Sequence, residues 1–249
     1  MSDEGYRAVH EDLETLLLPQ SILILLSSFG LIWLALAAIV LVLHKRRPET
    51  LIGSPTIAFL QAKFVIVALL LLTVAMLLMP PYGYSPALEG GLPFGRWVLF
   101  LVPALLAVFI QTSAEEVLFR GYLQQQLAAR FNHPAIWMML PSVLFGLAHY
   151  APDTYGSNAW LVVIWAGIFG LFAADLTARS GTLGPAIALH FATNVSALLL
   201  IAPQGEMSGL ALFQHGFSAA DEDAVRAFLP IDFAVMLVSW LAARLALRR

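Results

Sequence analysis

The residues best suited to chemistry in this chain are two adjacent acidic residues, Glu115 and Glu116, with Arg120 close behind. They follow an apolar run, residues 97–114, that contains no charged residue. A charged group in lipid costs about 2.5–3.5 kcal/mol on insertion scales, so it needs a partner or a function. Glu116 and Arg120 are four residues apart and share a helix face, whereas Glu115 is rotated by roughly 100° from Glu116. We therefore expect Arg120 to neutralise Glu116 and to leave Glu115 free to react.

Later apolar segments supply further polar side chains. His190 and Asn194 are four residues apart and project from one helix face, and Phe145 and His149 have the same spacing. A single histidine at the end of a span is more often an interfacial anchor than a catalyst. Two histidines, an asparagine and a glutamate pair spread over three spans instead indicate a polar site, and Asn194 needs a hydrogen-bond partner in hydrocarbon.

These side chains together suit the hydrolysis of an amide bond. A carboxylate can act as general base on a water, and a histidine can share that water or protonate the leaving group. A second histidine and an asparagine amide can donate hydrogen bonds to a developing oxyanion. This chemistry requires no Ser, Cys or Thr nucleophile.

The composition requires a membrane protein. Of the 249 residues 60% are hydrophobic and 12% are charged, and a soluble domain carries about twice that share of charge. The absence of cysteine excludes disulfides, thiolate catalysis and Cys-ligated zinc. The net charge of −3 does not decide for or against nucleic acid, but no basic patch suggests such a partner and we expect none.

Apolar runs predict an all-α, polytopic helical membrane protein that forms a single integral membrane domain over residues 1–249. A polar, helical extension is expected over residues 121–130, and a short surface helix around residues 219–228. We expect seven transmembrane helices, at about residues 22–43, 57–79, 97–120 with the acidic motif at the far end, 134–149, 159–178, 183–201 and 228–247.

The distribution of charge predicts the orientation. Lys and Arg residues follow the first, third, fifth and seventh segments, and most Asp and Glu residues lie on the opposite side. The positive-inside rule then places the N-terminus outside and the C-terminus in the cytoplasm, with the acidic motif toward the cytoplasmic face. The start of the chain, through Glu14, is acidic and unlike a signal peptide, so we expect the first helix to be retained.

The depth of the polar groups poses a geometric problem. Glu115 lies about 27 Å from the start of its segment, and His149 lies about 22 Å from the start of its own, which runs the opposite way. On straight, upright helices the two side chains would differ in depth. Tilt, kinks at Pro103 and Pro141, or a shorter fourth segment must bring them together if they share a site.

Three motifs in order resemble those of the CPBP family, which comprises CAAX prenyl endopeptidases and bacteriocin-processing and immunity proteins and is also called the Abi family. They are Glu-Glu-x-x-x-Arg at 115–120, Phe-x-x-x-His at 145–149 and His-x-x-x-Asn at 190–194. Each motif alone is weak, but three in order within membrane spans are specific. The resemblance covers residues 97–201, the expected catalytic core.

The resemblance implies an intramembrane endopeptidase of the glutamic type, acting on a membrane-associated protein or peptide near the cytoplasmic face. It implies that Glu115 is the catalytic glutamate and that His149 helps it to activate water. His190 and Asn194 resemble the pair of an oxyanion hole. The supporting residues are Glu116, Arg120 and Phe145. We expect an integral protein of a prokaryotic plasma membrane that needs no cofactor.

Three alternatives remain open from the sequence. Glu115, His149 and His190 could form a three-ligand zinc site, but the chain lacks His-Glu-x-x-His, which favours the metal-free interpretation. A non-catalytic immunity or scaffold protein could share the fold, since a fold does not guarantee activity. A transporter with a proton relay predicts repeated halves with broken helices, and the sequence shows no such symmetry.

Overall fold

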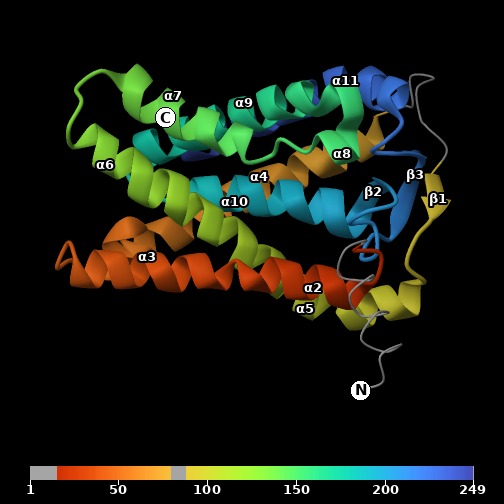
Figure 1. Ribbon diagram of the computed structural model, residues 1–249, viewed down its shortest axis with the longest axis horizontal. Coiled ribbons are helices and arrows are strands. Elements are labelled where there is room, and N and C mark those ends of the chain that lie inside the picture. The colour runs from red at the N-terminus through yellow and green to blue at the C-terminus, as the bar shows by residue number, and fades with distance from the viewer. Residues whose placement is uncertain (1–15, 80–87, 249) are drawn as a thin grey trace.

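The computed structural model describes residues 16–79 and 88–248, and it is mostly helical, with long helices packed side by side (Figure 1). The acidic start of the chain, through Glu14, lies outside the described residues. The helices longer than a single turn are α2 (Pro19–Ser28), α3 (Gly30–Val42), α4 (Pro55–Leu78), α5 (Phe94–Glu116), η2 (Val117–Gln124), α7 (Pro134–Leu147), α9 (Ala159–Ser180), α10 (Gly184–Val195), η4 (Ser196–Leu200) and α11 (Glu222–Leu247). Short helical turns complete the connections: η1 (Pro48–Leu51), α6 (Gln125–Ala128), α8 (Pro152–Tyr155) and η3 (Gly156–Asn158).

The described residues contain five helical stretches that are long and apolar enough to cross a membrane, and two shorter apolar helices. The long stretches are Pro19–Val42, Pro55–Leu78, Phe94–Ala128, Pro152–Ser180 and Glu222–Leu247, and the shorter ones are Pro134–Leu147 and Gly184–Leu200. They correspond in order to the seven predicted segments, and the prediction of a helical, polytopic membrane protein is confirmed. The number of crossings and the orientation stay predictions.

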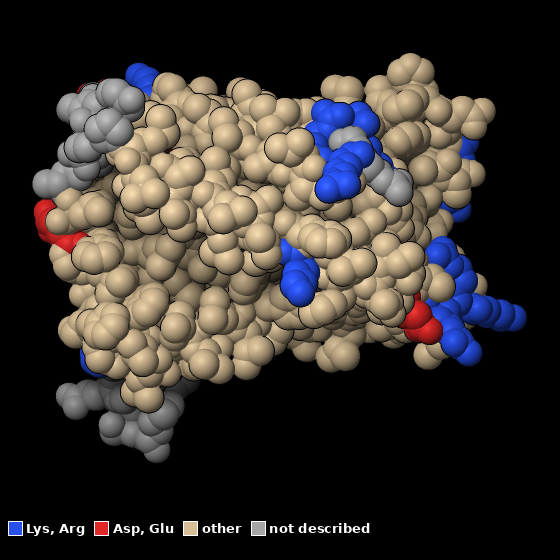
Figure 2. All heavy atoms as spheres, turned by 180° about the vertical axis from the view of Figure 1, so that it is seen from behind, with Lys and Arg blue, Asp and Glu red and all other residues tan. Residues whose placement is uncertain are grey.

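The outer surface of the helices is apolar, as a lipid environment requires. Phe59 is 75% exposed and Leu77 is 79% exposed on α4, and Leu99 is 73% exposed on α5. In Figure 2 the middle of the molecule is mostly tan, and much of the Lys and Arg lies toward the end that carries α6 in Figure 1. This arrangement agrees with an apolar band flanked by charged ends.

Two segments differ in detail from the prediction. The first is divided at Phe29 into α2 and α3. The predicted surface helix at 219–228 is the beginning of α11, which starts at Glu222 and continues to Leu247 without a break. Asp221 caps this helix, because its side chain accepts a hydrogen bond from the backbone N–H of Ala224 at 3.1 Å.

A small sheet, which the sequence analysis did not predict, closes one end of the helices. It consists of β1 (Leu88–Gly90), β3 (Phe213–Ser218) and β2 (Ile201–Gln204) in that order. β3 pairs antiparallel with β1 and parallel with β2. In Figure 1 the sheet lies at the end where α5 and α11 begin. It ties the loop before α5 to the chain after α10, and so holds the two helices that carry most of the polar site.

The expected difference in depth is removed by a helical hairpin. Helix α5 does not stop at the acidic motif but continues through η2 and α6 to Ala128. Glu115 therefore lies about 20 Å before the end of this continuous helix at Ala128. His149 lies about 22 Å after the start of helix α7, which runs in the opposite direction. Because the two paths have nearly equal length, both residues reach the same level.

Candidate active site

The acidic motif lies at the junction of α5 and η2, with Glu116 and Arg120 fully buried. Arg120 Nη1 donates a hydrogen bond to Glu116 Oε1 at 3.0 Å. The predicted pair therefore forms, and it forms inside the protein rather than at a helix end in water. A buried pair needs further hydrogen bonds to offset the loss of hydration.

Arg120 obtains those further contacts from two neighbouring helices. Its Nη2 donates to the carbonyl of Gly170 on α9 at 2.9 Å, and its guanidinium lies 4.7 Å from the centre of the Phe145 ring on α7. A Cβ at Gly170 would lie 3.0 Å from Nη2, so glycine permits the close approach. One turn later, Gln124 Nε2 donates to the carbonyl of Ala174 at 3.2 Å. Arg120 thus joins three helices.

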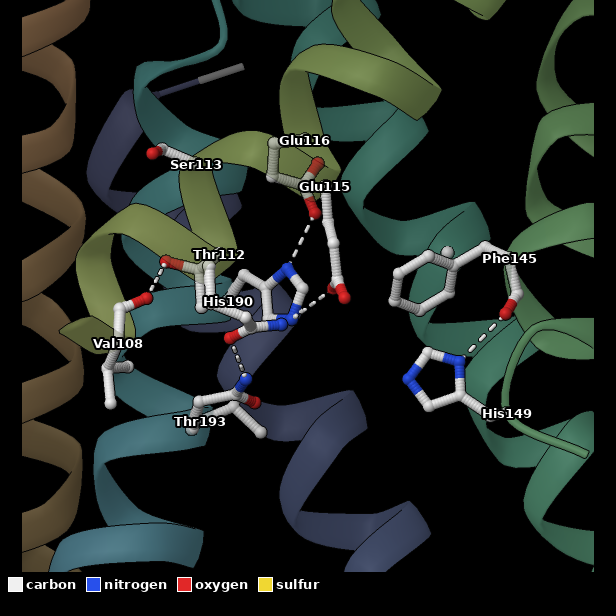
Figure 3. A network of polar contacts seen from close by, with 12 residues as sticks. Val108, Thr112, Ser113, Glu115, Glu116, Phe145, His149, His190 and Thr193 are labelled. Carbon is white, nitrogen blue, oxygen red and sulfur yellow. Dashed lines mark hydrogen bonds and ion pairs between the residues drawn. The ribbon is translucent and has the colours of Figure 1, made fainter. Parts of the chain in front are cut away.

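His190 on α10 contacts both carboxylates (Figure 3). Its Nδ1 lies 2.8 Å from Glu116 Oε1, and its Nε2 lies 3.5 Å from Glu115 Oε2. The imidazole is 3% exposed, and the Glu115 side chain is 12% exposed. Glu115 Oε2 is itself buried without a hydrogen bond among the described residues. The sequence predicted a polar cluster but not that His190 would link the two glutamates.

His149 stands across from this cluster, at the end of α7. Its Nδ1 lies 2.8 Å from the carbonyl oxygen of Phe145. Because a carbonyl can only accept, Nδ1 must carry the proton, and in the neutral ring Nε2 then presents a lone pair. The Phe145 ring packs against both histidines, with its centre 4.6 Å from that of the His149 ring and 5.8 Å from that of the His190 ring. No hydrogen bond joins His149 directly to Glu115 within residues 88–248, but Figure 3 shows its free nitrogen on the side of the Glu115 carboxylate.

Asn194 has a partner that the sequence analysis missed. Its Nδ2 donates to Oε1 of Gln111 on α5 at 2.9 Å, and Gln111 is 6% exposed. Gln111 precedes Glu115 by four residues, just as His190 precedes Asn194 by four. Because α5 and α10 run in opposite directions, the two helices form two polar contacts one turn apart, Gln111 with Asn194 and Glu115 with His190. The spacing of Gln111 from Glu115 was the available signal.

Both motif helices change to π geometry directly after the predicted site residues. The π-helix η2 begins at Val117, immediately after Glu116, and η4 begins at Ser196, two residues after Asn194. Short π segments are rare and occur frequently at functional sites. Hydrophobic periodicity does not distinguish such a segment from an α-helix, so the sequence could not reveal either one.

The predicted zinc alternative finds no prearranged ligand set. Within the two described ranges, no group of three or more His, Asp or Glu side chains is arranged to hold a metal ion. His149 Nδ1 lies against a backbone carbonyl, which leaves Nε2 as the ring nitrogen that could face a ligand. The zinc alternative and the metal-free interpretation both stay predictions.

An apolar groove of about 1090 Å³ lies beside the polar cluster, between α2, α3, α5 and α10. Ser113 lines it, and the Ser113 hydroxyl accepts a hydrogen bond from Trp33 Nε1 at 3.2 Å. None of the predicted site residues lines this groove. Neighbouring residues of α5 thus face two sides: Ser113 lines the groove, and the two glutamates contact His190.

Comparisons with known proteins agree with the motif pattern. Residues 96–196 match the family model described as type II CAAX prenyl endopeptidase Rce1-like. A curated relative, the uncharacterized protein YyaK of Bacillus subtilis (strain 168), is 31% identical over 118 residues. That match covers 46% of this chain and 38% of the relative, so it spans well under half of the relative's length. No solved structure matches this chain.

The matched segment contains every residue that the sequence analysis assigned to the site, from Glu115 to Asn194. It also contains Gln111, which only the structure revealed. Over residues 96–196 the chain thus resembles the Rce1-like family of type II CAAX prenyl endopeptidases, and the resemblance that the three motifs predicted is confirmed for that segment.

Proposed function

We propose that the chain is a glutamic intramembrane endopeptidase that hydrolyses a peptide bond of a membrane-associated protein or peptide near the cytoplasmic face. The observation that carries this proposal is the contact of one buried histidine, His190, with both Glu115 and Glu116. A structural ion pair would need only Glu116 and Arg120. Glu115 adds a second carboxylate, and its Oε2 atom, which is buried without a hydrogen bond among the described residues, supports a chemical role.

In the proposed reaction, a water lies between the Glu115 carboxylate and Nε2 of His149. Both groups can accept a proton, because the Phe145 carbonyl holds the proton of His149 on Nδ1. The water oxygen attacks the carbonyl carbon of the scissile bond while its proton passes to Glu115, with His149 sharing the water's second hydrogen. Glu116 and Arg120 position His190 and do not touch the substrate.

The carbonyl oxygen of the substrate becomes an oxyanion in this step. Both ring nitrogens of His190 face carboxylate oxygens, so we infer that the ring carries two protons. Nε2–H of His190 and Nδ2–H of Asn194 then donate to the oxyanion. The intermediate collapses as the C–N bond breaks, and the proton on Glu115 moves to the leaving amine. One peptide and one water thus give one carboxylic acid and one amine.

The proposal needs no metal, and it places the reaction in a prokaryotic plasma membrane. The family description names a CAAX prenyl endopeptidase; for this chain the substrate class is a membrane-associated polypeptide, whether or not it is prenylated. Lipid surrounds the apolar faces of α4 and α5 described above.

The test is comparative proteomics of membranes from cells whose own copy is deleted and which carry either the wild-type chain or Glu115→Ala. We expect at least one membrane peptide whose cleaved form appears only with the wild-type chain. Thr112→Val is the matched control, because Thr112 is buried on α5 and its hydroxyl donates to the backbone carbonyls of Val108 and Phe109 in its own helix. Identical peptide sets in the wild type and Glu115→Ala would favour the non-catalytic scaffold instead.

A further inference from the structure

We propose that Gln111 is a positioning residue of the site, and that it orients the Asn194 amide so that one N–H faces the reacting carbonyl. The inference rests on the proposed function, because it assigns a role to a neighbour of the proposed oxyanion donor. Gln111 belongs to none of the three motifs, and within residues 16–79 and 88–248 its side chain forms a hydrogen bond with Asn194.

The argument begins with the freedom of an asparagine side chain. The Asn194 amide is attached through rotatable bonds, and either its oxygen or its nitrogen could face the site. Gln111 Oε1 accepts a hydrogen bond from Asn194 Nδ2 at 2.9 Å. This contact turns the NH2 group toward α5, the helix that carries Glu115, and uses one of its two hydrogens. The second hydrogen has no partner among the described residues, and it remains available to a substrate.

The placement of Gln111 suits this role better than a purely structural one. It is 6% exposed, and a buried amide in hydrocarbon is retained only where it finds a partner. It lies four residues before Glu115, on the same face of α5. The contact between Gln111 and Asn194 therefore runs beside the contact between Glu115 and His190, one helical turn away, or about 6 Å along the axis. The two contacts fix the proposed base, Glu115, and the proposed oxyanion donor, Asn194, in position relative to each other.

The geometry leads to a specific kinetic expectation. Gln111→Met preserves the length and approximate volume of the side chain but removes the strong acceptor. The Asn194 amide then rotates more freely and presents its N–H to the oxyanion less often. We expect kcat to fall by about 10–100-fold, the range that a misplaced catalytic group produces. We expect KM to stay within about twofold, because the lost interaction acts in the transition state.

The experiment is a double-mutant cycle on the purified full chain. The probe is a synthetic peptide that spans the bond identified by the membrane proteomics described above. Gln111→Met, Asn194→Ala and the double variant are compared with the wild type. If Gln111 acts only through Asn194, the double variant is no slower than Asn194→Ala alone. Thr112→Val again serves as the control for loss of a buried polar group from α5, and we expect its kcat to be unchanged.

Two results would overturn this inference. One is a Gln111→Met variant with the kcat of the wild type while Asn194→Ala is impaired. The other is a double variant in which kcat falls by the product of the two single effects, which would show that Gln111 supports the fold independently of Asn194. Failure of the proposed function gives a different result, in which Glu115→Gln and Asn194→Ala both cleave the peptide at the rate of the wild type.

Discussion

Replacing Arg120 by alanine tests the buried ion pair most directly. Arg120 and Glu116 are both fully buried, and Arg120 also donates to the Gly170 carbonyl and lies over the Phe145 ring. In Arg120→Ala the Glu116 carboxylate loses its cationic partner inside the protein. Breaking a buried pair from one side costs about 3–5 kcal/mol. For a chain of this size, that loss corresponds to a decrease in Tm of roughly 6–20 °C.

The assay is thermal unfolding of the purified chain in one mild detergent, followed by circular dichroism. Arg179→Ala is the matched control, because Arg179 pairs with Asp175 across the same spacing of four residues at 2.6 Å but is 44% exposed. A pair whose arginine stays largely solvated contributes less than a fully buried one, so this control should lower Tm much less than Arg120→Ala. The double variant Glu116→Gln/Arg120→Met removes both charges and should recover much of the loss.

The reasoning would be refuted by an Arg120→Ala variant that unfolds at the temperature of the wild type. It would also be refuted if the double variant unfolded at a clearly lower temperature than Arg120→Ala, as expected when two substitutions act independently. In either case, Glu116 would not depend on Arg120 as the 3.0 Å contact implies.

Four further outcomes follow from the site and from the sheet. Glu115→Gln should abolish cleavage of the identified peptide and keep the helical circular dichroism signal, because an amide cannot take the proton of the water. Asn194→Ala should slow single-turnover cleavage by about 10²–10³-fold, the effect of one lost oxyanion donor, without abolishing it. Chelators should leave the rate intact, and elemental analysis should find no stoichiometric zinc; one tightly bound zinc per chain, with activity restored only by metal, would contradict this. Burial lowers the pKa of His215 on β3, so the folded chain binds this proton less readily than the unfolded chain does. The folded chain therefore keeps its full stability above the ordinary histidine pKa of about 6.5, and it loses stability as the pH falls below that value. His215→Phe keeps the ring between Phe217 and Phe228, and it should reduce the difference in Tm between pH 8 and pH 5.

The sequence predicted those parts of the site that depend on spacing within one helix. The pairing of Glu116 with Arg120 follows from a spacing of four residues, and it is present at 3.0 Å. The positions of the apolar helices follow from runs of hydrophobic residues, and they agree to within a few residues. The roles assigned to Glu115, His149, His190 and Asn194 stay predictions.

The features that escaped prediction depend on contacts between helices or on backbone geometry. The link from His190 to Glu116 joins residues 74 positions apart, and no pattern in a single sequence reports it. Gln111 was overlooked because one glutamine in a span matches no motif. The three strands are only three to six residues long, which is too short for an alternating pattern to stand out.

The link that His190 makes between two carboxylates has a consequence for the net charge of the site during the proposed reaction. With the doubly protonated His190 of the proposed reaction, two ionised glutamates, one arginine and this histidine sum to zero, so the resting cluster would place no net charge in the membrane. When Glu115 takes a proton from water, the protein becomes positive by one unit as the tetrahedral adduct becomes negative by one. The two charges arise side by side, and they cancel when the proton passes to the leaving amine. Hydrolysis in this arrangement moves charge over a few ångströms and creates no net charge that the surrounding lipid would have to accommodate.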